Sequence, residues 1–174
     1  GATMTEPTHN GHPIVKERQT GLGLYVTAKE AYDMWQADPE GMKVLDVRTP
    51  EEWVNVGHPP MATLIPFAFM AYVWDEEKGG FPWSLNPGFL ERVQERFAPT
   101  DTILVTCRSG GRAAMAINMM TAAGYTNAYN IVDGVEGDLV DDPGSVYHGK
   151  RMKNGWKNCA PWVYSIDPEK IILE

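Results

Sequence analysis

The stretch ILVTCRSGGRAAM, from Ile103 to Met115, constrains the fold more than any other part of the chain. Its first four residues form an apolar run typical of a buried strand. A helix-forming run follows from Arg112 to Ala123, and Gly124 is suited to end it. A cysteine and two glycines lie in the turn between the two runs. A strand that turns directly into a helix is typical of parallel sheets, because parallel strands need a crossover connection between them.

Strands and helices alternate along most of the remaining chain. Apolar runs predict strands at 43–47, around Ile65 and at 127–132. Capping patterns predict helices that begin at Thr27, at Thr49 and near Asn86, with Glu30 and Glu52 completing the first two as capping boxes. These elements predict an α/β fold of three layers, in which helices cover both faces of a central, mostly parallel sheet.

The length of 174 residues suits a single domain with additions at its ends. We expect a flexible arm over residues 1–20, which includes Gly1 to Thr3 as a scar of expression. The folded domain is expected over 21–140. The character of the sequence then changes to Gly, Pro, Lys and Trp, so we expect residues 141–174 to form a C-terminal tail that wraps the domain.

Composition excludes several classes of function. The net charge of −8 argues against nucleic acid and against an anionic membrane as partners. No apolar run approaches the about 18 residues that a membrane-spanning helix needs. Two cysteines and four scattered histidines make a zinc site improbable, and we expect no metal and no cofactor. No secretory leader follows Met4, so we expect a cytoplasmic protein, or a periplasmic one if a signal peptide was removed before expression.

Cys107 stands where an anion is expected to bind. It ends its strand at the sheet edge where α/β proteins bind ligands, and it precedes a helix whose unpaired N–H groups favour negative charge. These features stabilise a thiolate over a thiol, so we expect a reactive Cys107. The rest of the loop supplies two positive charges, a hydroxyl donor and two flexible positions, namely Arg108 and Arg112, Ser109, and Gly110 and Gly111.

With these residues, the chain resembles a single-domain rhodanese, that is, a rhodanese-like sulfurtransferase. The motifs that carry the resemblance follow the family's order between residues 43 and 137 and are Val44-Leu-Asp-Val-Arg48, Thr49-Pro-Glu-Glu-Trp53, Gly57-His58, Cys107-Arg-Ser-Gly-Gly-Arg112, Gly124-Tyr125 and Asp133-Gly134. The resemblance implies the rhodanese α/β fold and transfer of sulfane sulfur.

In that family reading, Cys107 takes sulfur from thiosulfate or a similar donor, holds it as a persulfide and passes it to cyanide or a thiol. The resemblance also implies that residues 108–112 bind the substrate, that Asp46 helps to hold the loop and that Arg48 ties into its surroundings. The partners implied are a small anionic sulfur donor and, as a further candidate, a sulfur-acceptor protein.

Two other functions stay open at this point. A cysteine-based phosphatase or arsenate reductase shares this fold, but its loop places five residues between Cys and Arg, and a His usually precedes the Cys. Here four residues separate Cys107 from Arg112, and Thr106 comes before the Cys. A shorter loop suits a single sulfur atom better than a tetrahedral phosphate. The other alternative is a non-enzymatic module that binds a partner protein.

Three segments depart from the family pattern. The first is Gly57-His-Pro-Pro-Met-Ala-Thr-Leu-Ile-Pro66, where the family usually continues from Gly-His into Ile-Pro-Gly-Ala and then Asn-Ile-Pro. The aromatic insertion from Phe67 to Pro87 is either a lid or partner surface, or a separate hydrophobic cluster. In the tail, Asn154-Gly-Trp-Lys157 is similar to tails of some bacterial rhodaneses. A basic cluster there either attracts an anionic donor or acidic partner, or is a solvated turn, and its members are Lys150, Arg151, Lys153 and Lys157. We expect Cys159 to be packed rather than to resolve a Cys107 persulfide, and His58 to be structural.

Overall fold

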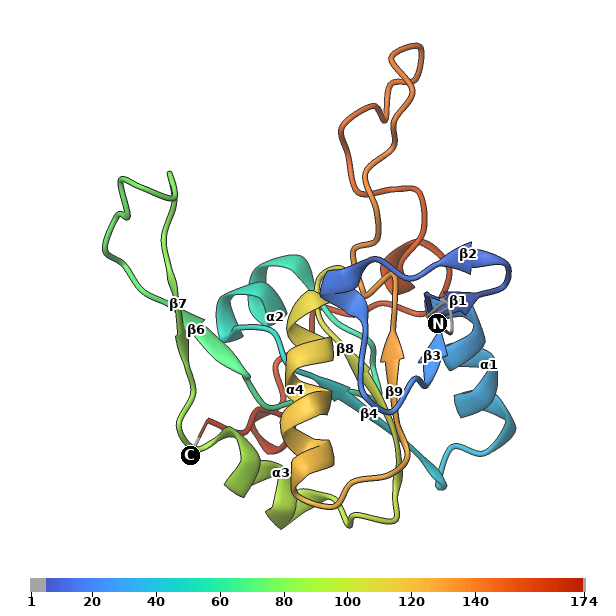
Figure 1. Ribbon diagram of the computed structural model, residues 1–174, viewed down its shortest axis with the longest axis vertical. Helices are drawn as coiled ribbons and strands as arrows, with labels where there is room; N and C mark the ends of the chain where they lie inside the picture. The colour runs from blue at the N-terminus through green and yellow to red at the C-terminus, as the bar shows by residue number, and fades with distance from the viewer. Residues whose placement is uncertain (1–5, 174) are drawn as a thin grey trace, which may run out of the picture.

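A five-stranded parallel sheet forms the centre of the protein (Figure 1). The computed structural model describes residues 6–173, so the expected scar at Gly1 to Thr3 lies outside the described residues. The strand order is β3-β9-β8-β4-β5. The bounds are β3 Tyr25–Val26, β4 Met42–Asp46, β5 Thr63–Leu64, β8 Thr102–Thr106 and β9 Ala128–Ile131. The prediction of a parallel α/β sheet is confirmed.

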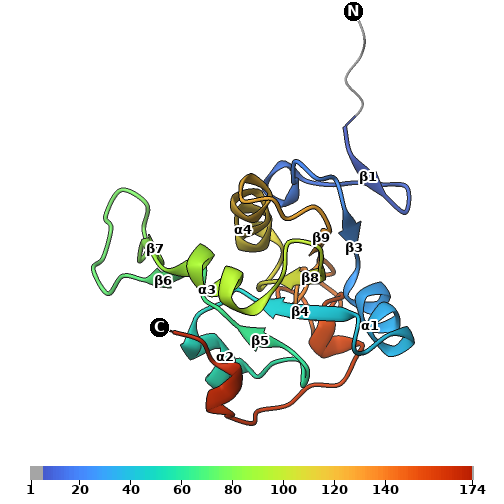
Figure 2. The ribbon, with the colours of Figure 1, turned by 90° about the horizontal axis from the view of Figure 1, so that it is seen from below.

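Helices cover both faces of this sheet, as predicted (Figure 2). On one face α3 (Phe89–Arg96) and α4 (Gly111–Ala122) pack on a core that includes Leu45 and Val105. On the other face α1 (Ala28–Ala37) and α2 (Pro50–Val56) pack on a core that includes Leu104. Neighbouring residues of one strand therefore serve different cores, because successive strand side chains point to opposite faces.

Local sequence signals explain where the helices begin. The side chains of Thr27 and Thr49 each accept the N–H at the third helical position, and both capping boxes are complete. The third start differs from the prediction, because α3 begins at Phe89 with Gly88 as its N-cap, while the Asn86 side chain accepts the Gly88 N–H at 3.1 Å. Within residues 6–173 none of the helices combines the length and apolar character that a membrane crossing requires.

The aromatic insertion forms an antiparallel hairpin that projects from the sheet layers (green in Figure 1). Its strands are β6 (Ala68–Met70) and β7 (Trp83–Leu85). At its base, Asn86 donates from its backbone N–H to the Phe67 carbonyl at 2.9 Å, which fixes the hairpin to the domain. The tip carries exposed aromatic side chains, with Trp74 and Phe81 packed edge to face at 5.5 Å.

The N-terminal segment is structured from residue 6 onward. Strands β1 (Thr8–His9) and β2 (His12–Pro13) form a short hairpin, and the 3-10 turn η1 (Lys16–Arg18) follows. The Arg18 guanidinium forms an ion pair with Asp138 at 2.6 Å, and the Arg18 carbonyl accepts the Asn130 side-chain amide at 2.8 Å. Residues 16–18 are thereby held on the folded domain.

The C-terminal tail runs back over the face of α1 and α2 and reaches the edge of the sheet. Residues 138–153 first make a projecting loop (orange, Figure 1). Trp156, in the 3-10 turn η2 (Trp156–Asn158), is then fully buried in the core of that face. Val163 exchanges two backbone hydrogen bonds with His58. After the turn η3 (Pro168–Lys170), the Ile172 N–H donates to the Leu64 carbonyl at 2.9 Å, so the tail covers the open edge of β5.

Candidate active site

The register of the sheet brings the cysteine loop to the carboxyl edge of the central strands. Asp46, the last residue of β4, lies opposite Thr106, the last residue of β8. The Val47 N–H continues the ladder by donating to the Thr106 carbonyl at 2.9 Å. Cys107 is the next residue, and its side chain is buried. The loop therefore begins at the sheet edge where α/β proteins bind ligands.

The Cys107 sulfur lies inside a cradle of backbone N–H groups. The N–H of Gly110 donates to Sγ at 3.1 Å, and the N–H of Ala113, in the first turn of α4, donates at 3.4 Å. Gly110 adopts a φ of +105°, and a Cβ there would lie 2.8 Å from the Val132 carbonyl oxygen. Glycine is therefore required at this position. The cradle can stabilise negative charge on sulfur.

The loop carbonyls are bound on the opposite side, away from the sulfur. The Cys107 carbonyl accepts the Val135 N–H at 2.9 Å, and the Arg108 carbonyl accepts the Glu136 N–H at 3.0 Å. The Asn130 side chain donates to the Gly110 carbonyl at 3.1 Å. These bonds fix the peptide planes that follow Cys107, Arg108 and Gly110, so the backbone of the loop is held in shape before any substrate arrives.

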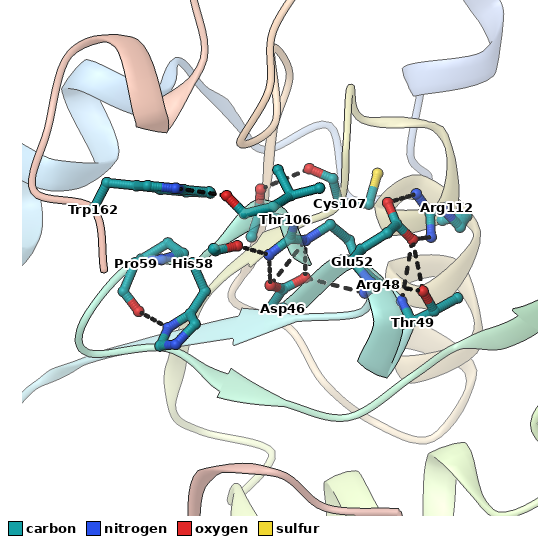
Figure 3. Close-up of polar contacts among 12 residues, drawn as sticks. Asp46, Arg48, Thr49, Glu52, His58, Pro59, Thr106, Cys107, Arg112 and Trp162 are labelled. Atoms are coloured by element: carbon teal, nitrogen blue, oxygen red, sulfur yellow. Dashed lines mark hydrogen bonds and ion pairs between the residues drawn. The ribbon is translucent and has the colours of Figure 1, made fainter. Parts of the chain in front are cut away.

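Arg112 is held by a carboxylate on another helix. Its two terminal nitrogens bind the two oxygens of Glu52, in α2, at 2.6 and 2.9 Å (Figure 3). The centroid of the Trp83 ring lies 4.6 Å from the guanidinium carbon of Arg112. Burial lowers the pKa of Arg112, but the hydrogen bonds and charge of Glu52 outweigh it and raise that pKa above its ordinary value. The sequence predicted only a capping role for Glu52, whereas in the structure Glu52 is also the counter-ion of Arg112.

Asp46 and Arg48 form a fully buried ion pair with each other (Figure 3). The Arg48 Nη2 atom lies 2.7 Å from Asp46 Oδ2 and also donates to the Gly57 carbonyl at 2.8 Å. The pair thus ties the end of β4 to the end of α2. Within the described residues, the hydrogen bonds of the Asp46 side chain go to Arg48 rather than to the loop.

A cavity of about 340 Å³ lies over the loop. Arg108 and Arg112 contribute to its wall, whereas Cys107 and Gly110 are buried, Ser109 and Gly111 are half-buried, and none of these four residues lines the cavity. The other walls come from the start of α2, the β6–β7 hairpin, the loop after β9 and the tail, and their residues are Thr49, Glu51, Glu52, Met70, Tyr72, Trp83, Glu136 and Arg151. Arg151 is thus a wall residue of the site, although the sequence marked it only as one member of a basic cluster.

His58 has a structural position. It is buried, stacks on Trp53 with ring centroids 3.5 Å apart, and its ring nitrogens lie 2.9 Å from the Pro59 carbonyl and 2.7 Å from the Ser165 carbonyl. Cys159 is exposed, so the prediction of a packed residue is wrong. It lines a different cavity, between the N-terminal hairpin and the tail, and partial burial of its thiol raises its pKa. Within residues 6–173 no three His, Cys, Asp or Glu side chains gather as a metal site.

The fold and the loop together define an α/β protein with a cysteine in an anion-stabilising cradle. The chain belongs to the rhodanese-like domain family, whose sequence model matches residues 27–138. It is 38% identical over 109 residues to thiosulfate sulfurtransferase 16, chloroplastic, of Arabidopsis thaliana, covering 63% of this chain and 81% of that relative. An uncharacterized protein of Rickettsia conorii is 33% identical over 144 residues, covering 80% and 96%.

The crystal structure of Rv0390 from M. tuberculosis is similar in fold, with a TM-score of 0.60 and 29% identity. The match covers 80% of this chain and 96% of Rv0390. The similarity therefore extends beyond residues 27–138, which the family model matches.

Proposed function

We propose that the protein is a sulfurtransferase that carries sulfane sulfur on Cys107. The donor is thiosulfate or a similar anion, and the acceptor is a thiol or cyanide. The observation that carries this proposal is the pair of N–H groups, from Gly110 and Ala113, that converge on the buried sulfur at 3.1 and 3.4 Å. A relative named as a thiosulfate sulfurtransferase supports the same donor.

The transfer balances without any further reactant. The Cys107 thiolate attacks the outer sulfur of thiosulfate, and a new S–S bond forms as the bond to the central sulfur breaks. Sulfite leaves with the electron pair of the broken bond, and Cys107 keeps a persulfide anion. In the second step, cyanide or a thiolate attacks the terminal sulfur and the Cys107 thiolate leaves. The same N–H groups stabilise the thiolate and the persulfide, so the fixed loop serves both steps.

The structure offers less support for phosphoryl chemistry. A phosphate in the loop needs N–H donors together with a guanidinium for its oxygens. Arg112, which would supply that guanidinium, is bound at both terminal nitrogens by Glu52. The Gly110 N–H also donates to Sγ at 3.1 Å, so this donor is already used by a single sulfur atom. Both observations favour a sulfur atom over a tetrahedral group as the species bound here.

The test is the intact mass of the protein after thiosulfate and again after cyanide. We expect a gain of one sulfur atom that cyanide removes. Cys107→Ser should show no gain, and the matched control Cys159→Ser should behave like wild type. No gain on wild type, or an equal gain on Cys107→Ser, contradicts the proposal. An assay with a small aryl phosphate would then test the phosphatase alternative.

A further inference from the structure

Two arginines from distant parts of the chain lie in the wall of the cavity over the cysteine loop. Arg108 follows the cysteine directly and is exposed, and Arg151 comes from the tail and is half-buried. Their positive charges face a space of about 340 Å³. Within residues 6–173, neither guanidinium forms an ion pair with a carboxylate.

Two hydrogen bonds to backbone carbonyls place Arg151 next to the loop. Its Nη1 atom donates to the Gly137 carbonyl at 2.8 Å, and the Gly137 N–H donates to the Arg108 carbonyl at 3.3 Å. One peptide segment therefore connects both arginines. Asp138 fixes the same segment, because its backbone N–H donates to the Asn154 side chain at 2.7 Å. Arg151 thus has a defined position relative to Arg108, although it lies on a projecting loop.

The carboxylates around the cavity mostly have other partners. Glu52 binds Arg112, and Glu136 lies 3.9 Å from the Lys157 ammonium. Glu51 accepts a hydrogen bond from the Tyr72 hydroxyl at 2.7 Å, which lowers the pKa of Glu51 and keeps its negative charge. The positive charges of Arg108 and Arg151 therefore exceed the single negative charge of Glu51 that these pairs leave in the wall.

The two guanidiniums also repel each other. Burial, followed by the charge of Arg108, outweighs the opposing charges of Glu136 and Asp138 and holds the pKa of Arg151 below its ordinary value. An anion placed between two like charges removes this repulsion and accepts hydrogen bonds from both planar groups. The cavity is consequently better suited to an anion than to a neutral molecule.

We propose that Arg108 and Arg151 together bind the sulfonyl oxygens of an anionic sulfur donor, so that a tail residue completes the donor site. This inference rests on the sulfur transfer proposed above. Arg108 is the residue after Cys107, so an anion held at the two arginines lies beside the cysteine loop. When the thiolate forms its bond to the outer sulfur of thiosulfate, sulfite leaves with the electron pair, and its charge develops beside the guanidiniums.

The test is the rate of persulfide formation in single turnovers of the full chain, followed by intact mass. The donors are thiosulfate, a dianion, and methanethiosulfonate, a monoanion. The variants are Arg151→Met and Arg151→Lys. The matched control is Lys150→Met, which also removes one positive charge. Lys150 is the residue before Arg151, and its exposed side chain does not line the cavity.

We expect Arg151→Met to lower the loading efficiency with thiosulfate about tenfold at low salt, with a smaller loss for methanethiosulfonate. Arg151→Lys, which keeps the charge but not the planar fork, should lose about threefold. Lys150→Met should stay within about twofold of wild type. Discharge of the preloaded persulfide by cyanide should not change, because the sulfonyl group has already left.

Equal loading by Arg151→Met and Lys150→Met overturns the inference, as does a loss confined to the discharge step, which would assign Arg151 to the acceptor. If Arg151→Met does not fold, Arg151→Lys decides, and wild-type loading by that variant overturns the inference. Failure of wild type to load from thiosulfate rejects the proposed function and this inference with it. Normal loading of wild type with an unaffected Arg151→Met rejects this inference alone.

Discussion

Replacing Glu52 by Gln tests whether the ion pair under the site stabilises the protein. The variant keeps the size of the side chain but removes the negative charge that faces Arg112. Both charged side chains are largely buried, since those of Arg112 and Glu52 are 10% and 19% exposed. Loss of Glu52 therefore leaves a mostly buried guanidinium without its counter-ion.

The magnitude follows from this partial burial. Breaking a fully buried pair costs about 3–5 kcal/mol, and breaking an exposed pair costs about 0–1 kcal/mol. The bidentate geometry and low exposure place this pair nearer the buried limit, so we expect a loss of about 2–3 kcal/mol at pH 7. For a chain of this length, the unfolding midpoint should fall by roughly 5–10 °C.

The loss should also depend on pH. Burial raises the pKa of Glu52, but the hydrogen bonds and charge of Arg112 outweigh it and hold that pKa below its ordinary value of 4.5. A carboxylate whose pKa is lowered by folding stabilises the folded state above its unfolded pKa, and this contribution disappears as the pH falls through its folded pKa. The difference between wild type and Glu52→Gln should therefore be complete above about pH 4.5 and shrink below it.

The assay is urea unfolding followed by tryptophan fluorescence at several pH values. Glu51→Gln is the matched control, because Glu51 occupies the neighbouring position in α2 and is exposed. Its loss should not exceed about 0.5 kcal/mol. Equal losses for the two variants, or a loss for Glu52→Gln that stays constant down to pH 3, would refute the reasoning.

Three further predictions concern the surroundings of the loop. Gly134→Ala places a Cβ 2.6 Å from the Cys107 carbonyl oxygen at a φ of +64°, so the rate of thiosulfate loading should fall roughly tenfold or more. The control Gly124→Ala adds a Cβ that meets nothing within 4 Å and should load normally. Equal loading by the two variants contradicts the prediction. Trp156→Ala empties a fully buried site and should cost about 3–5 kcal/mol in urea unfolding while exposing the tail to proteolysis; a resistant tail would show that other contacts hold it. Trp83→Ala removes the ring beside the Arg112 guanidinium and should cost about 0.5–1 kcal/mol in thermal unfolding.

Local elements were predictable where a few neighbouring residues determine them. The capping boxes at Thr27 and Thr49 fix helix starts through contacts that span three residues, so they can be read from the chain. The start of α3 was less predictable, because the Asn86 side chain binds a backbone N–H two residues on and Gly88 becomes the cap. The hairpin of β6 and β7 was not predicted, because its pairing depends on contact between segments about fifteen residues apart.

The sequence by itself determined the parallel α/β class and the position of Cys107 between a strand and a helix, because both depend on short-range periodicity and turn chemistry. Only the tertiary structure decided which charges face the cysteine. Arg112 is paired with Glu52 although 60 residues separate them, and Arg151 reaches the cavity from the tail. Such pairings depend on the sheet order and on the path of the tail, which no local pattern specifies.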